Sequence, residues 1–187
     1  MMNKKFRAFF AWMLPEPLQL EIKPYLNSLK KEFLSTDIRF TALEQLHLTL
    51  RFLGNISEED SLRLVTAAEH TLKNTPSFPI QLTGIDFFPS QQSKKTLIAT
   101  CPPNPALITL THAIEQLVQS LGVTPETRPF HPHVTLARMR EKLRKEIINT
   151  DFSLPIDGIV QEISLMRSDS TKDGVVYSSV WTKTLKD

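Results

Sequence analysis

The stretch HLTLRFLG at residues 47–54 and the stretch HPHVTLAR at residues 131–138 contain the same tetrad, H-x-T-L. The first tetrad runs from His47 to Leu50 and the second from His133 to Leu136. Only five histidines occur in the 187 residues, so chance disfavours two copies of this pattern. The repeat therefore predicts a fold in which two similar segments, far apart in the chain, serve one site.

Each tetrad has the alternation of a strand that is buried on one side. Side chains at positions i and i+2 of a strand share a face. His47 and Thr49 therefore point to one side, while Leu48 and Leu50 point to the core, and the second tetrad has the same pattern. We expect each strand to present an imidazole beside a hydroxyl on a rigid apolar support.

The rest of the chain alternates between strand-like and helix-like segments. Apolar residues at helical spacing predict a helix from Pro17 to about Phe33, in which Pro24 indicates either a kink or a later start. Ser57 and Asn104 are typical N-cap residues and predict helices over 58–73 and 105–121. Strands are expected at 6–14, 46–53, 80–88, 96–100, 133–137, 159–167 and 175–185, and a short helix at 141–148.

This order mixes strand pairs with strand–helix crossovers, which favours an α+β fold over a doubly wound parallel sheet. The length suits one domain with a core of its own. The proline-rich stretch 101–105 is too short for an interdomain linker. We expect a single domain over residues 1–187.

Composition excludes several classes of protein. The net charge of +2 is much smaller than the basic excess of proteins that bind nucleic acid mainly through phosphate contacts. The single cysteine, Cys101, excludes an intrachain disulfide. No stretch approaches the roughly 20 apolar residues that cross a bilayer, and the short apolar run 6–14 lacks a signal-peptide cleavage site. We expect a cytoplasmic monomer.

Two imidazoles and two hydroxyls around one point suit the chemistry of a phosphodiester. An imidazole titrates near pH 6.5, so one can act as a base while the other acts as an acid. The threonine hydroxyls can donate hydrogen bonds to the non-bridging oxygens, where negative charge grows in the transition state. Such a reaction needs neither a metal nor a cofactor, and the residues alone do not decide which imidazole is the acid.

The tetrads and their flanks, HLTLRFLG and PFHPHVTLAR, resemble those of the 2H phosphoesterase superfamily, and in particular its RNA 2′,3′-cyclic phosphodiesterases, also called 2′-5′ RNA ligases. The opening RAFFAWMLP and the closing stretch from Leu165 to Leu185 are similar to the family's first strand and final hairpin. The resemblance implies a bilobal α+β fold, with two pseudo-symmetric lobes, each an antiparallel sheet with outer helices, around a central cleft.

The resemblance also implies roles for individual residues. His47 would protonate the departing 3′ oxygen of a terminal ribose 2′,3′-cyclic phosphate, and His133 would activate the attacking water. Thr49 and Thr135 would hold the phosphate. Two further substrate-binding residues are implied: Arg138, which needs a bulge or the strand's end to reach the cleft, and a base-stacking aromatic of the first strand, Phe10 or Phe9.

Other interpretations of the residues stay open. His131 and His133 form an H-x-H pair, but a catalytic zinc usually has three protein ligands, and no motif supplies the third, so we expect no metal. Arg51 follows Thr49 and could reach phosphate or form an ion pair at the rim, and Tyr177 could line the site or pack in the core. The alternatives for function are a non-catalytic module that binds RNA ends, and a 2H enzyme for another cyclic phosphate or a 2′-5′ oligonucleotide.

Overall fold

The computed structural model describes residues 5–33, 38–89, 96–139, 152–172 and 174–187. Its elements in chain order are β1 (Lys5–Met13), α1 (Glu16–Glu32), β2 (Ile38–Phe40), a 3-10 turn (Leu43–Gln45), β3 (His47–Ser57), α2 (Glu58–Thr71), β4 (Phe78–Phe88), β5 (Thr96–Thr100), α3 (Pro105–Ser120), β6 (His133–Met139), β7 (Phe152–Val160), β8 (Glu162–Thr171) and β9 (Gly174–Thr184). The helix expected at 141–148 lies outside the described residues.

One sheet contains all of these strands. Its order is β7-β4-β5-β6-β3-β1-β8-β9, with β2 paired to β6, and every pairing between these strands is antiparallel. The middle of the order falls between β6 and β3, the two strands that begin with the tetrad histidines. The α+β fold is thus confirmed, and the fold brings the two tetrads to the centre of the sheet.

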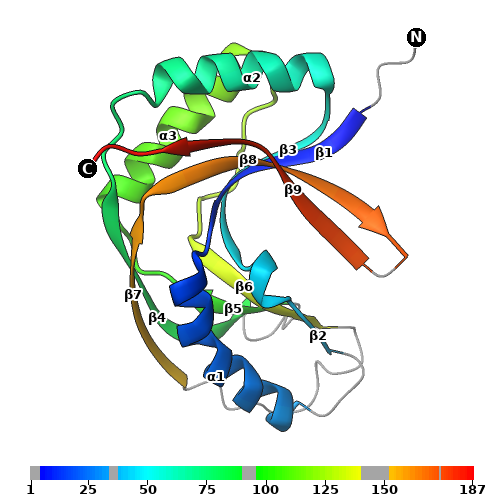
Figure 1. Ribbon diagram of the computed structural model, residues 1–187, viewed down its shortest axis with the longest axis vertical. Coiled ribbons are helices and arrows are strands. Elements are labelled where there is room, and N and C mark those ends of the chain that lie inside the picture. The colour runs from blue at the N-terminus through cyan, green and yellow to red at the C-terminus, as the bar shows by residue number, and fades with distance from the viewer. Residues whose placement is uncertain (1–4, 34–37, 90–95, 140–151, 173) are drawn as a thin grey trace.

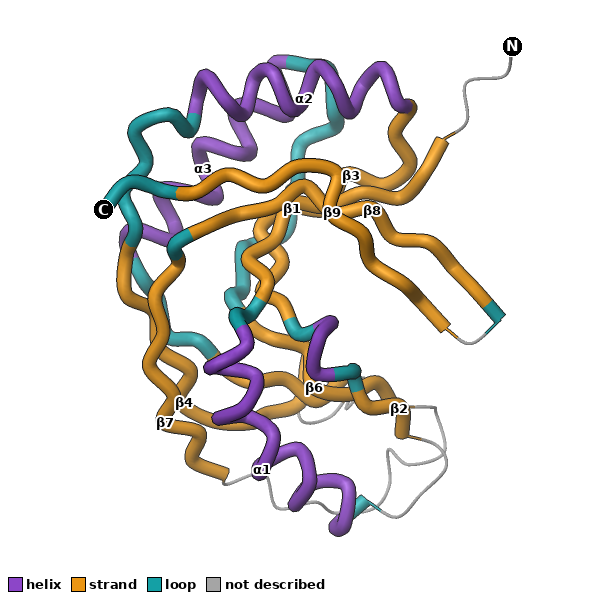
Figure 2. The backbone as a smooth tube through the Cα atoms, in the orientation of Figure 1, coloured by secondary structure: helices purple, strands orange, loops and turns teal. Residues whose placement is uncertain are grey.

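The helices lie outside the two halves of this curved sheet (Figure 1). α2 and α3 pack together beside the half that contains β3, β1, β8 and β9, while α1 covers the other half (Figure 2). α1 buries Leu18, Ile22, Leu26 and Leu29, as the helical spacing predicts. The helix begins at Glu16 and contains Pro24, so the alternative of a later start was wrong.

Two helix starts follow their caps closely. Ser57 and Asp60 form a reciprocal capping box at the start of α2. The side chain of Asn104 accepts hydrogen bonds from the backbone N–H groups of Ala106 and Leu107 at the start of α3. Each cap satisfies backbone donors that the helix itself leaves unpaired.

The strand β3 runs through Gly54, where we expected it to end. A β-bulge, in which one strand has an extra residue, explains part of this irregular course. Thr49 lies opposite Ala11 of β1 and Arg51 lies opposite Phe10, so Leu50 is an extra residue. A second shift, at Leu53, precedes Gly54, whose φ of 72° suits a glycine.

The strand β6 has a bulge at the equivalent place. Thr135 lies opposite Ile98 of β5 and Ala137 lies opposite Leu97, so Leu136 is an extra residue. The fourth residue of each tetrad is therefore a bulged leucine. Such a bulge shifts the alternation by one position, so that the side chains beyond it change faces.

Two strands were not predicted from the sequence. β2 has only three residues, and β7 contains Pro155 and Gly158, two residue types that are unfavourable inside strands. A proline is tolerated in β7 because this strand lies at the edge of the sheet, next to β4 alone. The hairpin of β8 and β9 matches the expectation, with Glu162 opposite Thr184. Within the described residues, no helix combines the length and apolar character needed to cross a lipid bilayer.

Candidate functional site

The tetrads meet at one pair of residues: Leu48 of β3 lies directly opposite Val134 of β6 in antiparallel register. The residues beside an opposed pair face each other across antiparallel strands. His47 therefore lies across from Thr135, and His133 lies across from Thr49. Diagonal neighbours on one face of such a pair are about 7–8 Å apart, which is the relation between the two histidines.

Both imidazoles are oriented in the same way. The Nδ1 atom of His47 is 2.7 Å from the carbonyl oxygen of Gln45, and the Nδ1 atom of His133 is 2.7 Å from the carbonyl oxygen of His131. A carbonyl oxygen only accepts, so each Nδ1 must carry the proton. In the neutral ring the Nε2 atom is then an acceptor, free to take a proton from a substrate or water.

Aromatic rings pack against each histidine. Phe9 and Tyr177 lie 5.0 and 5.1 Å from the ring of His47, measured between centroids. Phe88, at the end of β4, stacks on His133 at 5.0 Å, with 21° between the ring planes. These contacts hold the rings in place and partly remove them from water, while both histidines keep part of their surface exposed.

The surroundings lower the pKa of both histidines. Burial is the main cause for each, because it disfavours the charged imidazolium. The charge of Arg138 lowers both pKa values further, and the charge of His133 lowers that of His47. These effects show that the two imidazoles and Arg138 share one electrostatic environment, although the sequence separates His47 from the other two.

The bulge at Leu136 explains the position of Arg138. Without it, strict alternation would place Arg138 on the face opposite His133. With Leu136 as an extra residue, Arg138 lies opposite Thr96 and is exposed, while Ala137 points into the core. The structure thus brings Arg138 to the histidine face by the route that the sequence required.

The aromatic of the first strand needs a correction. Phe10 is fully buried in the core, where its ring meets Trp181 edge-on, so it offers no surface to a base. Phe9 is the residue of β1 that faces His47. Phe9 is also buried, with 3% of its surface exposed, because Phe52 and Tyr177 cover it together with His47. Neither Phe9 nor Phe10 is open to a ligand.

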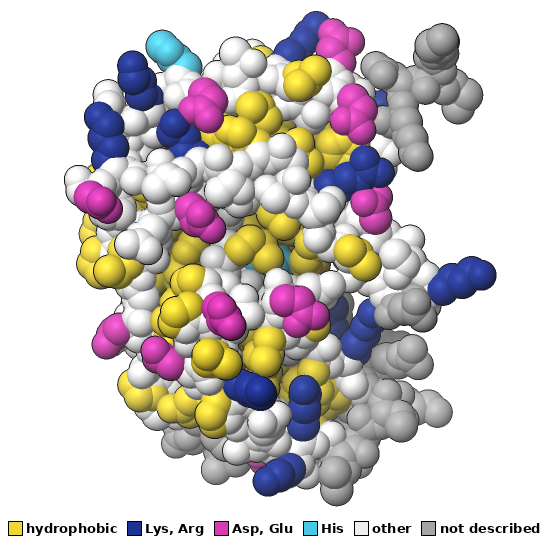
Figure 3. Space-filling model, viewed as in Figure 1, with side chains coloured by type: hydrophobic (Ala, Val, Ile, Leu, Met, Phe, Trp, Pro, Cys, Tyr) yellow, Lys and Arg dark blue, Asp and Glu magenta, His cyan; other side chains and the backbone are white. Residues whose placement is uncertain are grey.

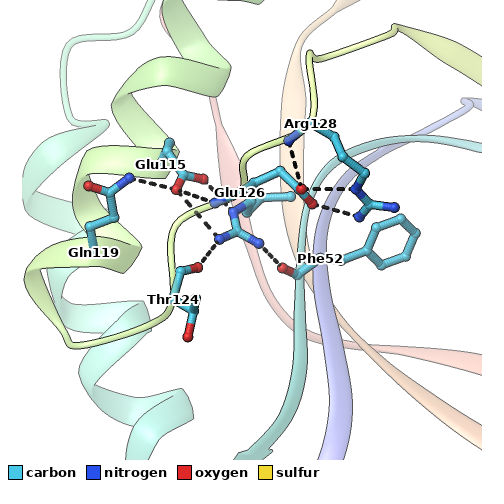
Figure 4. Close-up of polar contacts among 7 residues, drawn as sticks. Phe52, Glu115, Gln119, Thr124, Glu126 and Arg128 are labelled. Atoms are coloured by element: carbon cyan, nitrogen blue, oxygen red, sulfur yellow. Dashed lines mark hydrogen bonds and ion pairs between the residues drawn. The ribbon is translucent and has the colours of Figure 1, made fainter.

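Arg51 does not share the histidine face, because the bulge at Leu50 turns it towards α3. Its guanidinium donates to the Glu115 carboxylate and to the carbonyl oxygens of Phe52 and Thr124 (Figure 4). Of the two outcomes left open for Arg51, the ion pair is the one observed. Phe52 takes the place expected of Arg51 and lies 5.9 Å from Phe9 between ring centroids.

Three further features could have suggested a function. The ring of His131 lies tilted against the rings of Phe88 and His133, and its backbone supplies the carbonyl that orients His133. Cys101 is buried, and burial raises the pKa of its thiol to about 11, which makes it a poor nucleophile. Within the described ranges, no group of three or more His, Cys, Asp and Glu side chains could hold a metal ion.

Sequence reasoning missed three contributors to the site. Gln45 orients His47 with a backbone carbonyl, which any residue type could provide. Phe88 reaches His133 from the end of a distant strand. Phe52 would have required knowledge of the bulge, although its place five residues after His47 matches that of Arg138 after His133.

An α+β fold whose antiparallel sheet has two paired H-x-T-L strands at its centre is typical of the two-histidine phosphoesterases. A family model described as the 2′-5′ RNA ligase superfamily matches residues 15–172. The chain belongs to this superfamily.

Curated relatives carry one shared name, RNA 2′,3′-cyclic phosphodiesterase. The protein of that name from Methanothermobacter thermautotrophicus is 28% identical over 182 residues, which cover 94% of this chain and 97% of the relative. The one from Escherichia coli is 31% identical over 137 residues, covering 73% of this chain and 74% of the relative.

Solved structures agree in fold. The protein TT0787 of Thermus thermophilus superposes with a TM-score of 0.83 at 23% identity, covering 96% of this chain and 98% of that one. E. coli LigT in its apo form gives a TM-score of 0.81 at 25% identity, covering 98% and 99%. LigT has also been crystallised in complex with 3′-AMP and with phosphate.

Proposed function

We propose that this protein hydrolyses the 2′,3′-cyclic phosphate at the end of an RNA to a 2′-phosphate, by acid–base catalysis with His47 and His133. The observation that carries the proposal is the register that opposes Leu48 to Val134, since it places both tetrads on one face at the centre of the sheet. Membership of the superfamily and the names of the relatives support the same substrate class.

The two imidazoles divide the proton transfers between them. Water attacks phosphorus, and the neutral Nε2 of His133 takes a proton from it. The bond between phosphorus and the 3′ oxygen breaks, and protonated His47 gives its Nε2 proton to that oxygen. One proton is accepted and one is donated, so the pair returns to its starting state after exchange with solvent. General acid–base catalysis of this kind contributes typically 10²–10⁴-fold.

The neighbouring side chains would stabilise the phosphate. Thr49 lies across from His133, and Thr135 lies across from His47. Both hydroxyls can donate hydrogen bonds to the non-bridging oxygens of the phosphate, where negative charge grows. Arg138 brings a fixed positive charge to the same face. On the face shown in Figure 3, acidic and basic side chains are intermixed.

The test is product analysis with adenosine 2′,3′-cyclic phosphate. We expect the 2′-phosphate as product, turnover that persists in EDTA, and a loss of at least 10²-fold in kcat for both His47→Ala and His133→Ala. Activity that survives both single replacements contradicts the mechanism. Binding of the cyclic phosphate without turnover would favour a non-catalytic module. Faster turnover of a different cyclic phosphate or of a 2′-5′ oligonucleotide would show that this compound, and not the RNA 2′,3′-cyclic phosphate, is the preferred substrate.

A substrate whose leaving group needs no protonation can show which histidine is the general acid. With sulfur in place of the 3′ oxygen, the departing thiolate leaves without a proton. We expect this substrate to restore activity to His47→Ala and not to His133→Ala, and the reverse pattern would exchange their roles. The same site can also join RNA ends: the 5′-hydroxyl of a second RNA attacks the cyclic phosphate in place of water, the bond from phosphorus to the 3′ oxygen breaks, that oxygen takes a proton, and a 2′-5′ bond results.

A further inference from the structure

A second arginine lies directly opposite Arg138 across a pair of strands. β2 is only three residues long, and its middle residue, Arg39, is the register partner of Arg138 in β6. Directly opposed residues of an antiparallel pair project to the same face of a sheet. Arg39 therefore projects to the histidine face, on which Arg138 also lies.

The burial of the neighbouring residues supports this placement. Ile38 and Phe40, on either side of Arg39, pack against the hydrophobic core, whereas Arg39 itself is exposed. In β6 the two residues that flank Arg138 are buried, and Arg138 is exposed. Each strand thus turns its apolar residues to the core and one arginine to the histidine face.

The backbone holds β2 beside the bulge of β6. The N–H group of Thr41, which follows β2, donates a hydrogen bond of 2.8 Å to the carbonyl oxygen of Leu136. Leu136 is the bulged residue that brings Arg138 to the histidine face. The position of Arg39 is therefore determined by the same local structure that places Arg138.

The guanidinium of Arg39 reaches the tip of the β8–β9 hairpin. A Cβ atom added to Gly174 would collide with this guanidinium, whose Cζ atom would be 3.0 Å away. The same hairpin carries Tyr177, which packs on the ring of His47. Arg39 thus lies at the rim of the site, between β2 and the hairpin. Arg138 lies further in, where its charge acts on both tetrad histidines.

Two opposed guanidinium groups suit a ligand with more than one negative charge. Like charges directly opposite each other destabilise a pair of strands, so an anion beside them is favourable. A guanidinium binds a phosphate group with planar, charge-assisted hydrogen bonds. At the end of an RNA the cyclic phosphate carries one negative charge, and the phosphodiester that joins the terminal nucleoside to the chain carries another. The inner arginine suits the first group, and the outer arginine suits the second.

We propose that Arg39 binds the phosphodiester group that precedes the terminal nucleoside, while the cyclic phosphate lies between His47 and His133. The inference rests on the proposed function and adds the residue that distinguishes an RNA chain from a mononucleotide. Contacts to phosphate carry no sequence information. Arg39 therefore predicts a preference for ends of at least two nucleotides, whatever their bases.

The experiment compares three substrates that end in the same cyclic phosphate. The first is adenosine 2′,3′-cyclic phosphate, and the second is the dinucleotide with one further adenosine joined by a 3′-5′ phosphodiester. The third is that dinucleotide with an uncharged methylphosphonate linkage. We expect the wild-type kcat/KM to be highest for the charged dinucleotide. In Arg39→Gln its advantage over the other two substrates falls by about 10-fold, as expected for the loss of a charge-assisted hydrogen bond.

Arg63→Gln is the matched control, since it removes an exposed arginine of α2 that is paired with Glu59. It should leave the preference for the charged dinucleotide at the wild-type value. A preference that stays unchanged in Arg39→Gln overturns the proposal. Equal losses on all three substrates would mean that Arg39 only holds the hairpin over His47, and would overturn it as well.

Failure of the proposed function has a different signature, in which the wild type hydrolyses none of the three substrates. Calorimetric binding of the two dinucleotides then tests Arg39 separately. Tighter binding of the phosphodiester than of the methylphosphonate, with the difference lost in Arg39→Gln, would support the contact. Equal binding of the two dinucleotides by the wild type would overturn it.

Discussion

The side-chain amide of Gln45 donates a hydrogen bond of 2.6 Å to the carbonyl oxygen of Val175, at the start of β9. The backbone carbonyl of the same glutamine accepts the hydrogen bond from Nδ1 of His47. Tyr177, two residues beyond Val175, packs edge-on against the His47 ring. The turn that orients His47 and the hairpin that covers it are thus tied together by one residue.

Gln45 therefore acts as a positioning residue. In Gln45→Ala the carbonyl remains, but the bond to Val175 is lost and the turn is less constrained. We expect kcat to fall several-fold while KM changes little, because a misplaced imidazole slows proton transfer more than it weakens binding. Gln19→Ala is the control, since it removes a side chain to backbone bond of 2.7 Å in α1. Equal kinetic losses in both variants would contradict the positioning role.

The charge of Arg138 should influence the pH dependence of the reaction rate. Its positive charge disfavours a proton on either imidazole, and it lowers the pKa of His47 and of His133. Removing that charge in Arg138→Gln should raise both pKa values and move the pH–rate profile to higher pH. NMR titration of the histidine ring protons measures the shift directly.

Arg63→Gln is the control for this prediction. It removes an exposed arginine from α2 that is paired with Glu59. We expect the histidine titrations to be unchanged in that variant. A downward shift of either histidine pKa in Arg138→Gln would contradict the electrostatic role of the guanidinium.

The lowered histidine pKa values also couple stability to pH. Well above pH 6.5, the ordinary pKa of histidine, His47 is mostly neutral in both the folded and the unfolded chain and contributes little pH dependence. As the pH falls below this value, the unfolded chain binds the proton first, and the free energy of unfolding decreases. His47→Gln should therefore lose less stability between pH 7.5 and pH 5.5 than the wild type, in urea denaturation. His70→Gln, on α2, controls for the loss of a histidine elsewhere, and an equal slope in His47→Gln and wild type would contradict the coupling.

The sequence carried enough information to pair the tetrads, since periodicity and repetition alone identified two strands with a histidine and a threonine on one face. The caps at Ser57 and Asn104 marked their helices for the same reason: the interactions are local. Local alternation also predicted strands at 159–167 and 175–185, which overlap β8 and β9.

What sequence reasoning missed depends on contacts between distant segments. A bulge is a mismatch between two strands, so neither Leu50 nor Leu136 shows it alone. The choice between Phe9 and Phe10 followed from which face of β1 meets the core, and β1 is flanked by β3 and β8. The partner of Arg51, Glu115, is in a helix far along the chain. The relation of the two halves by pseudo-symmetry stays a prediction.

Asn104 links the start of α3 to β4 and provides a test of stability that is separate from the active face. Its side-chain oxygen caps the helix, and its amide nitrogen donates a bond of 2.8 Å to the carbonyl oxygen of Pro79. Asn104→Ala loses both roles, whereas Asn104→Asp keeps the acceptor and loses the donor. Loss of an N-cap costs about 1 kcal/mol, and the second bond contributes about 0.5–1.5 kcal/mol.

We therefore expect the free energy of unfolding, measured in urea, to decrease in the order wild type, Asn104→Asp, Asn104→Ala. A carboxylate at the start of a helix also interacts favourably with the helix dipole, which keeps the aspartate variant nearer to the wild type. α3 contacts β3 through the ion pair of Glu115 and Arg51, which neither variant alters. Both variants should therefore retain the wild-type KM for a cyclic phosphate. An alanine variant as stable as the aspartate variant would show that the cap contributes nothing, and that the bond to Pro79 accounts for the whole effect.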